Sequence, residues 1–165
     1  DAHPLPEAAL LARYQGTGAY TDCYATTVAA AVSQAEFVAA FYTTPVFKLE
    51  RAILRLVARP STDEEARELA AARRDSFAAW ELEDRCADQL LLTDFRGRTR
   101  SWLMTQPLEQ GQSTRLLFGS AVVPVRNHGG EAGLGVAVQA LMGFHKLYSV
   151  VLLHAAARRL RDRHV

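Results

Sequence analysis

The chain has 165 residues, of which 49% are hydrophobic and 22% are charged. These proportions are typical of a soluble globular domain and exclude a disordered or low-complexity chain. Lys and Arg number 19 and Asp and Glu 18, so the net charge of +1 gives no electrostatic reason to bind nucleic acid or anionic lipid.

The two cysteines, Cys23 and Cys86, are too few for a disulfide scaffold or a four-cysteine zinc site. We interpret them as unpaired thiols, which favours a reducing compartment and a cytoplasmic location; a disulfide between them is the alternative. No apolar run approaches the ~18–20 residues that a membrane span needs. The opening DAHPLPEAALL lacks the basic start and clean apolar stretch of an intact signal peptide.

Residues 1–19 are broken by prolines and glycines and are predicted to form an N-terminal arm, with at most a short helix over residues 7–13. Residues 20–165 are predicted to form a single domain. Its first element is a strand over residues 20–28, a stretch rich in Tyr and Thr.

Two capping boxes, in which a Ser or Thr side chain and an acidic residue satisfy each other's backbone amides, mark helix starts. The first begins at Ser33 and the second within residues 61–64. Three short helices are therefore predicted after the first strand: residues 34–42, residues 47–58, and a more polar, outward-lying helix that ends near Arg74.

From Asp75 the hydrophobic period changes from that of a helix to that of a strand. Four strands are predicted, over residues 77–84, 89–95, 99–106 and 114–123. Their short connections indicate an antiparallel meander. Residues 131–163 follow as one long amphipathic helix, about 50 Å in length at ~1.5 Å per residue.

The order of elements predicts an α+β domain. A curved antiparallel sheet must cover its apolar face, and the long C-terminal helix is the element long and apolar enough to do so. We therefore expect the sheet to wrap around that helix, with the short helices between the first and second strands and a cavity between sheet and helix.

Four stretches of sequence resemble an uncharacterised bacterial family of START-like (helix-grip, SRPBCC-type) domains. They are AFYTTPVFKLER at residues 40–51, residues 88–94, GRTRSWLM at residues 97–104 and LFGSAVVP at residues 117–124. The resemblance covers most of residues 20–155 and implies a helix-grip fold. Members of that family occur alone or fused behind dehydrogenase-like domains. No activity is assigned to them, so the resemblance implies no catalytic residue.

The histidines and cysteines do not have the spacing of a metal site. There is no HxxxH or CxxC motif, and His145 and His154 would project from opposite sides of one helix. We therefore expect no bound metal and no cofactor.

The hairpin around residues 94–102 carries the most informative charges. With a three-residue turn, Asp94 faces Arg100, and both share a face with Trp102 and an apolar wall formed by Leu90 and Leu92. With a two-residue turn, the register shifts by one and separates Asp94 from Arg100. In the register of the three-residue turn, Arg100 lies at one end of the apolar wall. It would there either form a structural salt bridge or hold a ligand carboxylate or enolate.

Aromatic residues and one histidine complete the predicted ligand site. Trp80, Trp102 and Phe118 would line one concave sheet face, with ordinary core packing as the alternative. His145 lies on the apolar stripe of the long helix, one turn before Tyr148. It is either a satisfied core residue or a proton donor and acceptor facing the cavity.

We expect a binding module for a small hydrophobic ligand, held in the cavity between the sheet and the C-terminal helix. One alternative is a cyclase- or isomerase-type enzyme that uses Arg100 and His145 as catalytic groups. A second is a protein-interaction or oligomerisation domain. The expected partner is a small hydrophobic molecule, with a homodimer as a further possibility; no nucleic acid and no membrane span are expected.

Overall fold

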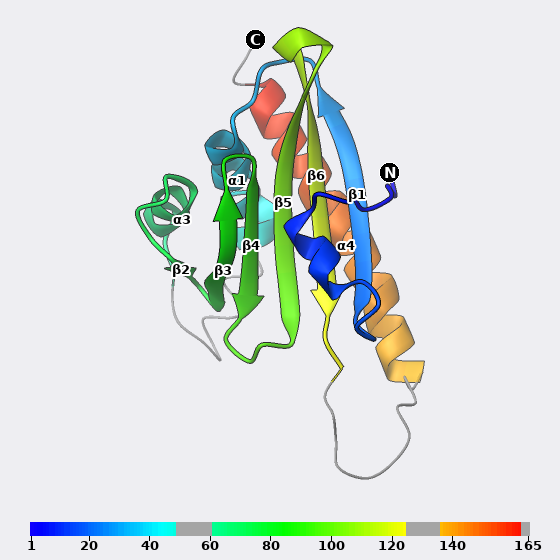
Figure 1. Cartoon of the computed structure of the whole chain (residues 1–165). Coiled ribbons are helices and arrows are strands. Elements are labelled where there is room, and N and C mark those ends of the chain that lie inside the picture. Colours follow the sequence, from blue (N-terminus) through cyan, green and yellow to red (C-terminus); the bar gives the residue numbers. More distant parts are fainter. Residues whose placement is uncertain (49–60, 125–135, 163–165) are drawn as a thin grey trace.

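The computed structural model describes residues 1–48, 61–124 and 136–162, with the backbone alone for 136–147. Six antiparallel strands form one sheet in the order β1-β6-β5-β4-β3-β2, and the long helix α4 crosses behind it (Figure 1). The strands are β1 (Tyr20–Val28), β2 (Ser76–Phe77), β3 (Trp80–Cys86), β4 (Gln89–Asp94), β5 (Thr99–Leu108) and β6 (Ser113–Val122). The helices are α1 (Gln34–Tyr42), α3 (Asp63–Ala70) and α4 (Val136–Arg161), with 3-10 segments η1 (Leu10–Tyr14) and η2 (Glu109–Gly111). The predicted α+β class, antiparallel sheet and C-terminal helix are confirmed.

β1 and α1 have the bounds predicted from the sequence. At the start of α1 the Ser33 hydroxyl accepts a hydrogen bond from the Glu36 amide, and the Glu36 carboxylate accepts one from the Ser33 amide at 2.9 Å. This is the predicted capping box. Residues 45–48 are helical, whereas the rest of the helix predicted over residues 47–58 lies outside the described residues.

Two predicted elements are shorter or divided. α3 ends at Ala70 rather than near Arg74, because Ala72 adopts a left-handed backbone with φ of 57° that a helix cannot continue. The strand predicted over residues 77–84 is divided into β2 and β3 by a tight turn, in which Ala78 has φ of 54°.

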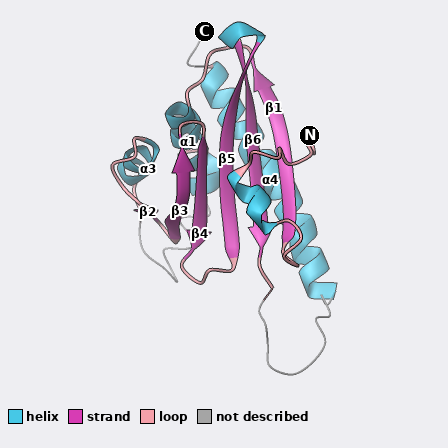
Figure 2. Ribbon diagram, in the orientation of Figure 1, coloured by secondary structure: helices cyan, strands magenta, loops and turns pink. Residues whose placement is uncertain are grey.

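One face of the sheet packs against the helices, and we call it the helix-covered face. Figure 2 shows α1, α3 and α4 on this side of the sheet. The face and its helices enclose the larger apolar core, which includes Tyr24, Phe37, Phe41, Leu90, Leu92, Leu103, Leu116, Phe118, Leu152 and Ala156. Its aromatic rings pack directly on one another, with 4.8 Å between the ring centroids of Phe41 and Phe118.

The opposite face is covered by the N-terminal arm, with η1 in front of the strands (Figure 1). We call it the arm-covered face. Its buried residues include Leu11, Cys23, Leu91, Trp102, Met104 and Leu117. The first residues of the arm also extend the sheet at β1, where the Ala25 amide donates to the Asp1 carbonyl and the His3 amide donates to the Cys23 carbonyl, both at 2.9 Å. Residues 1–19 are therefore one layer of the fold.

Gln89 joins the arm to the sheet. Its Oε1 accepts hydrogen bonds from the Leu10 amide at 2.8 Å and from Trp102 Nε1 at 2.9 Å, and its Nε2 donates to the Ala8 carbonyl at 3.1 Å. The Gln89 side chain is buried, and its bond to Trp102 satisfies an indole N–H that is buried as well.

None of the helices in the described ranges combines the length and apolar character that crossing a bilayer demands.

We predict that Gln89→Leu lowers the free energy of unfolding by about 2–4 kcal/mol, because it leaves the buried Trp102 indole N–H and the part-buried Leu10 amide without an acceptor. Gln106→Leu is the control: this side chain lies on the neighbouring strand β5 and is half-exposed, so we expect a change within ~0.5 kcal/mol. Urea unfolding measures both. Equal stability of the two variants would contradict the role given to Gln89.

Candidate functional site

The hairpin between β4 and β5 has the register of the two-residue turn. Thr93 lies opposite Arg100 and Leu91 lies opposite Trp102. The prediction that Asp94, Arg100 and Trp102 share a face with Leu90 and Leu92 is therefore wrong. Asp94 instead organises the turn, because its Oδ1 accepts hydrogen bonds from the Arg98 amide at 2.6 Å and from the Thr99 amide at 3.1 Å.

Arg100 lies on the arm-covered face in a structural salt bridge. Its Nε donates to Glu83 Oε2 at 2.7 Å and to the Tyr14 hydroxyl at 2.8 Å, and its guanidinium stacks 4.8 Å from the centre of the Tyr14 ring. Trp102 is on the same face, fully buried beneath the arm. Neither side chain reaches the space between the sheet and α4.

Three of the predicted ligand residues do lie on the helix-covered face. Phe118 is buried there, and Trp80 and Tyr148 are half-buried against the same core. Trp80 Nε1 is buried and has no hydrogen-bond partner within the described part of the chain. His145 lies in α4, but its side chain is outside the described residues.

Polar side chains cluster on the helix-covered face where β1, β6 and β5 meet. Ser101, Ser120 and Asp22 lie directly opposite one another on these strands. Ser120 donates to Asp22 Oδ1 from its hydroxyl at 2.6 Å and from its amide at 3.1 Å. The Tyr42 hydroxyl lies 2.9 Å from Ser101 Oγ. Burial, and then the nearby Asp22 carboxylate, raise the pKa of Tyr24 to about 12. The cluster is thus a hydrogen-bonded network within the core.

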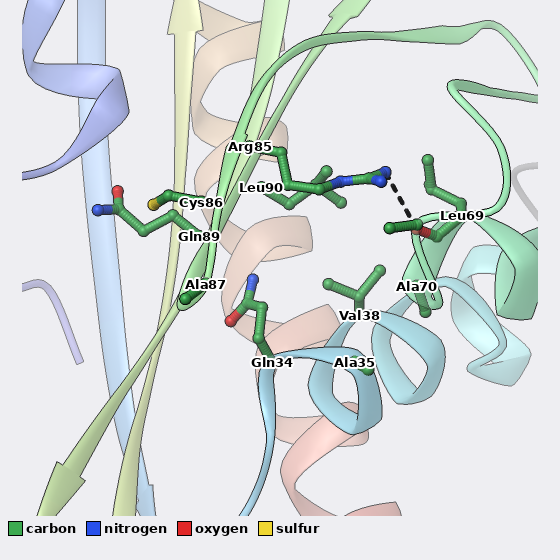
Figure 3. Close-up of a pocket in the computed structure, with 11 residues that line it drawn as sticks. Gln34, Ala35, Val38, Leu69, Ala70, Arg85, Cys86, Ala87, Gln89 and Leu90 are labelled. Carbon is green, nitrogen blue, oxygen red and sulfur yellow. Dashed lines mark hydrogen bonds between the residues drawn. The ribbon is translucent and has the colours of Figure 1, made fainter.

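The structure has a pocket of about 440 Å³ at another place, between α1, the end of α3 and the hairpin of β3 and β4 (Figure 3). We call it the α1–α3 pocket. Its lining residues are Gln34, Ala35, Val38, Leu69, Ala70, Ala72, Arg85, Cys86, Ala87, Gln89 and Leu90. Val38, Leu69 and Leu90 are buried and make an apolar floor, while Ala35, Ala72 and Ala87 are exposed at the rim.

A β-bulge places Arg85 in this pocket. The pairing of β3 with β4 is regular up to Leu82 opposite Leu92, and it resumes one residue later with Asp84 opposite Leu91. Because side chains alternate between faces, the extra residue reverses the alternation, so that Arg85 is opposite Leu90 on the helix-covered face. The Arg85 NH2 nitrogen donates to the Leu69 carbonyl at 3.1 Å and to the Arg74 carbonyl at 3.3 Å, which holds the side chain across the pocket (Figure 3).

Gln34 contributes the second polar side chain, from the first turn of α1. Its Nε2 donates to the Leu103 carbonyl at 3.0 Å, and this bond fixes the orientation of the amide. Its Oε1 is buried and has no donor within the described residues. The Cys86 and Gln89 side chains point to the other side of the hairpin in Figure 3, so they line the pocket through their backbone.

The pocket combines an apolar floor with two polar side chains, a guanidinium and an amide. Partial burial and the hydrogen bond to Asp88 raise the pKa of the Cys86 thiol, so it stays protonated at neutral pH. In the described ranges, no three His, Cys, Asp or Glu side chains come together as a metal site. Comparison with models of protein families and with curated proteins finds no match to this chain.

Sequence reasoning missed Arg85 and Gln34. Arg85 had been assigned to the connection between two strands, and Gln34 was noted only as the first residue of a helix. The one signal in the sequence is the charged run Glu83-Asp84-Arg85, which interrupts the alternation of the strand as a bulge does.

We predict that stability falls between about pH 10 and pH 12 in part through Tyr24. Its raised pKa means that the folded state holds the phenol proton more tightly than the unfolded state. The resulting stabilisation is complete below the ordinary pKa of ~10 and is lost as the pH approaches 12. Urea unfolding at pH 9 and pH 11.5 should show a smaller loss in Tyr24→Phe than in the parent protein. An equal loss in both would show that Tyr24 does not contribute.

Proposed function

We propose that this domain binds a small, mainly apolar molecule in the α1–α3 pocket. The observation that carries the proposal is the pocket itself: about 440 Å³, with an apolar floor of Val38, Leu69 and Leu90 and two polar side chains. Sites for small molecules typically have volumes of ~300–1,000 Å³ and combine an apolar lining with a few polar groups that orient the ligand.

We also propose that the domain has the helix-grip fold. The antiparallel sheet and α4 are compatible with it, and the short helices stand between β1 and β2 as in that arrangement. The sequence placed the ligand between the sheet and the C-terminal helix. The side chains of residues 136–147, which include His145, lie outside the described part, so a site beneath α4 stays a prediction.

Binding is better supported than catalysis. The enzyme alternative requires Arg100 and His145 to converge on one cavity, but Arg100 is held by Glu83 and Tyr14 on the arm-covered face. α4 lies on the other side of the sheet (Figure 1). The α1–α3 pocket offers a guanidinium and an amide, which can orient a ligand but do not exchange protons near pH 7.

The test is a substitution that fills the pocket from its rim. Ala35 is exposed and lines the pocket, so Ala35→Phe should occupy part of the space without disturbing the core. We predict that the neutral fluorescent probe N-phenyl-1-naphthylamine binds the parent protein and binds Ala35→Phe about tenfold or more weakly. That factor corresponds to about 1.4 kcal/mol.

Ala29→Phe is the matched control, because Ala29 is also exposed but does not line the pocket. It should bind the probe as the parent protein does. Absence of probe binding to the parent protein would remove the proposal and favour the interaction-domain alternative. Equal binding by Ala35→Phe and the parent protein would place the ligand elsewhere.

A further inference from the structure

We propose that the ligand of the α1–α3 pocket is an apolar carboxylate, with its carboxylate bound by Arg85. This inference rests on the proposed function and adds the chemical class of the ligand. A guanidinium carries five N–H donors, and the two hydrogen bonds that Arg85 makes to described residues both come from NH2.

The guanidinium of Arg85 has no carboxylate within 4.0 Å among the residues that the structure describes. The two acids that precede it in β3 both lie on the arm-covered face, and it is the bulge that separates Glu83 from Arg85. There Glu83 pairs with Arg100 and Asp84 pairs with Arg13. The strand therefore places its positive charge in the pocket and its negative charges outside.

The acids of α3 do not neutralise Arg85 either. Glu65 and Glu68 both pair with Arg74, at 2.8 and 3.4 Å. The two carbonyls that accept hydrogen bonds from Arg85 carry only partial negative charge. Arg85 therefore has no direct carboxylate partner among the described residues, and the planar fork of its guanidinium suits the two oxygens of a ligand carboxylate.

Gln34 sets the orientation of such a ligand. Its Oε1 is buried and has no donor among the described residues, so its partial negative charge disfavours a second anionic oxygen at the α1 end of the pocket. The carboxylate then lies at Arg85 and the apolar body lies along Val38, Leu69 and Leu90. The pocket selects a carboxylate with one charged end and an aliphatic or aromatic body.

The experiment compares octanoate with octan-1-ol, which have the same chain length and differ in charge. Each competes with N-phenyl-1-naphthylamine for binding to the protein. We expect octanoate to bind the parent protein about ten- to hundredfold more tightly than the alcohol, the range expected of hydrogen bonds to a charged group. Arg85→Gln should remove this preference for octanoate. Arg85→Lys should keep part of it, because lysine retains the positive charge but lacks the planar guanidinium that binds both carboxylate oxygens.

Arg96→Gln is the control, since Arg96 is exposed in the turn between β4 and β5, away from the pocket, and it should keep the full preference. Circular dichroism shows whether Arg85→Gln folds, because Arg85 also caps α3. If it does not fold, the ratio of octanoate affinity to octanol affinity in the parent protein still tests whether the ligand is a carboxylate.

Equal displacement of the probe by both compounds overturns the carboxylate assignment but not the proposed binding of an apolar molecule in the pocket. An unchanged preference in a folded Arg85→Gln overturns the role of Arg85. Failure of the probe and of both compounds to bind removes the proposed function as well.

Discussion

Burial of the central strands on both faces is the constraint on which the rest of the structure depends. Leu90, Leu91 and Leu92 are consecutive residues of β4, and each is at most 2% exposed. Successive side chains of a strand point to opposite faces, so such a run needs apolar cover on both sides. The helices cover one side and the N-terminal arm covers the other. Gln89 ties the arm to the sheet, because it bonds to the Leu10 amide and to the Ala8 carbonyl. The α1–α3 pocket lies where the helix layer meets the hairpin of β3 and β4.

The bulge in β3 divides the charges between the two faces. A regular strand would place Arg85 on the same side as Glu83, where the two opposite charges could neutralise each other. One extra residue puts Glu83 and Asp84 under the arm, where each meets an arginine, and turns Arg85 toward α3. The bulge therefore places Asp84 beside Arg13 of the arm and leaves a positive charge beside an apolar floor. Bulges commonly redirect a side chain next to a functional site, and the proposed function uses this one in that way.

The sequence predicts the bounds of the helices and strands better than it predicts the face of the sheet on which each side chain lies. β1 and α1 have the predicted bounds because composition and a capping box mark them locally. The register around Arg100 was predicted one residue away from the observed pairing, and a shift of one moves every side chain to the other face. Trp102 and Arg100 were assigned to the ligand site for that reason. β4, β5 and β6 each contain consecutive apolar residues, a pattern typical of strands that are buried on both faces of a sheet. The N-terminal arm is the segment that covers the second face. The charged run Glu83-Asp84-Arg85 is the one local sign of the bulge, but the face on which Arg85 lies depends on the exact pairing of β3 with β4.

A ligand that lies against α1, α3 and the hairpin of β3 and β4 touches the methyl groups of Val38, Leu69 and Leu90 on the floor of the pocket. Methyl-resolved NMR spectra of the protein titrated with octanoate report on each of these groups separately. We expect shifts in the methyl signals of these three residues and none in Leu117, which is buried on the arm-covered face. Shifts confined to Leu152 and Leu153 of α4, with the three pocket residues unchanged, would contradict this placement of the ligand.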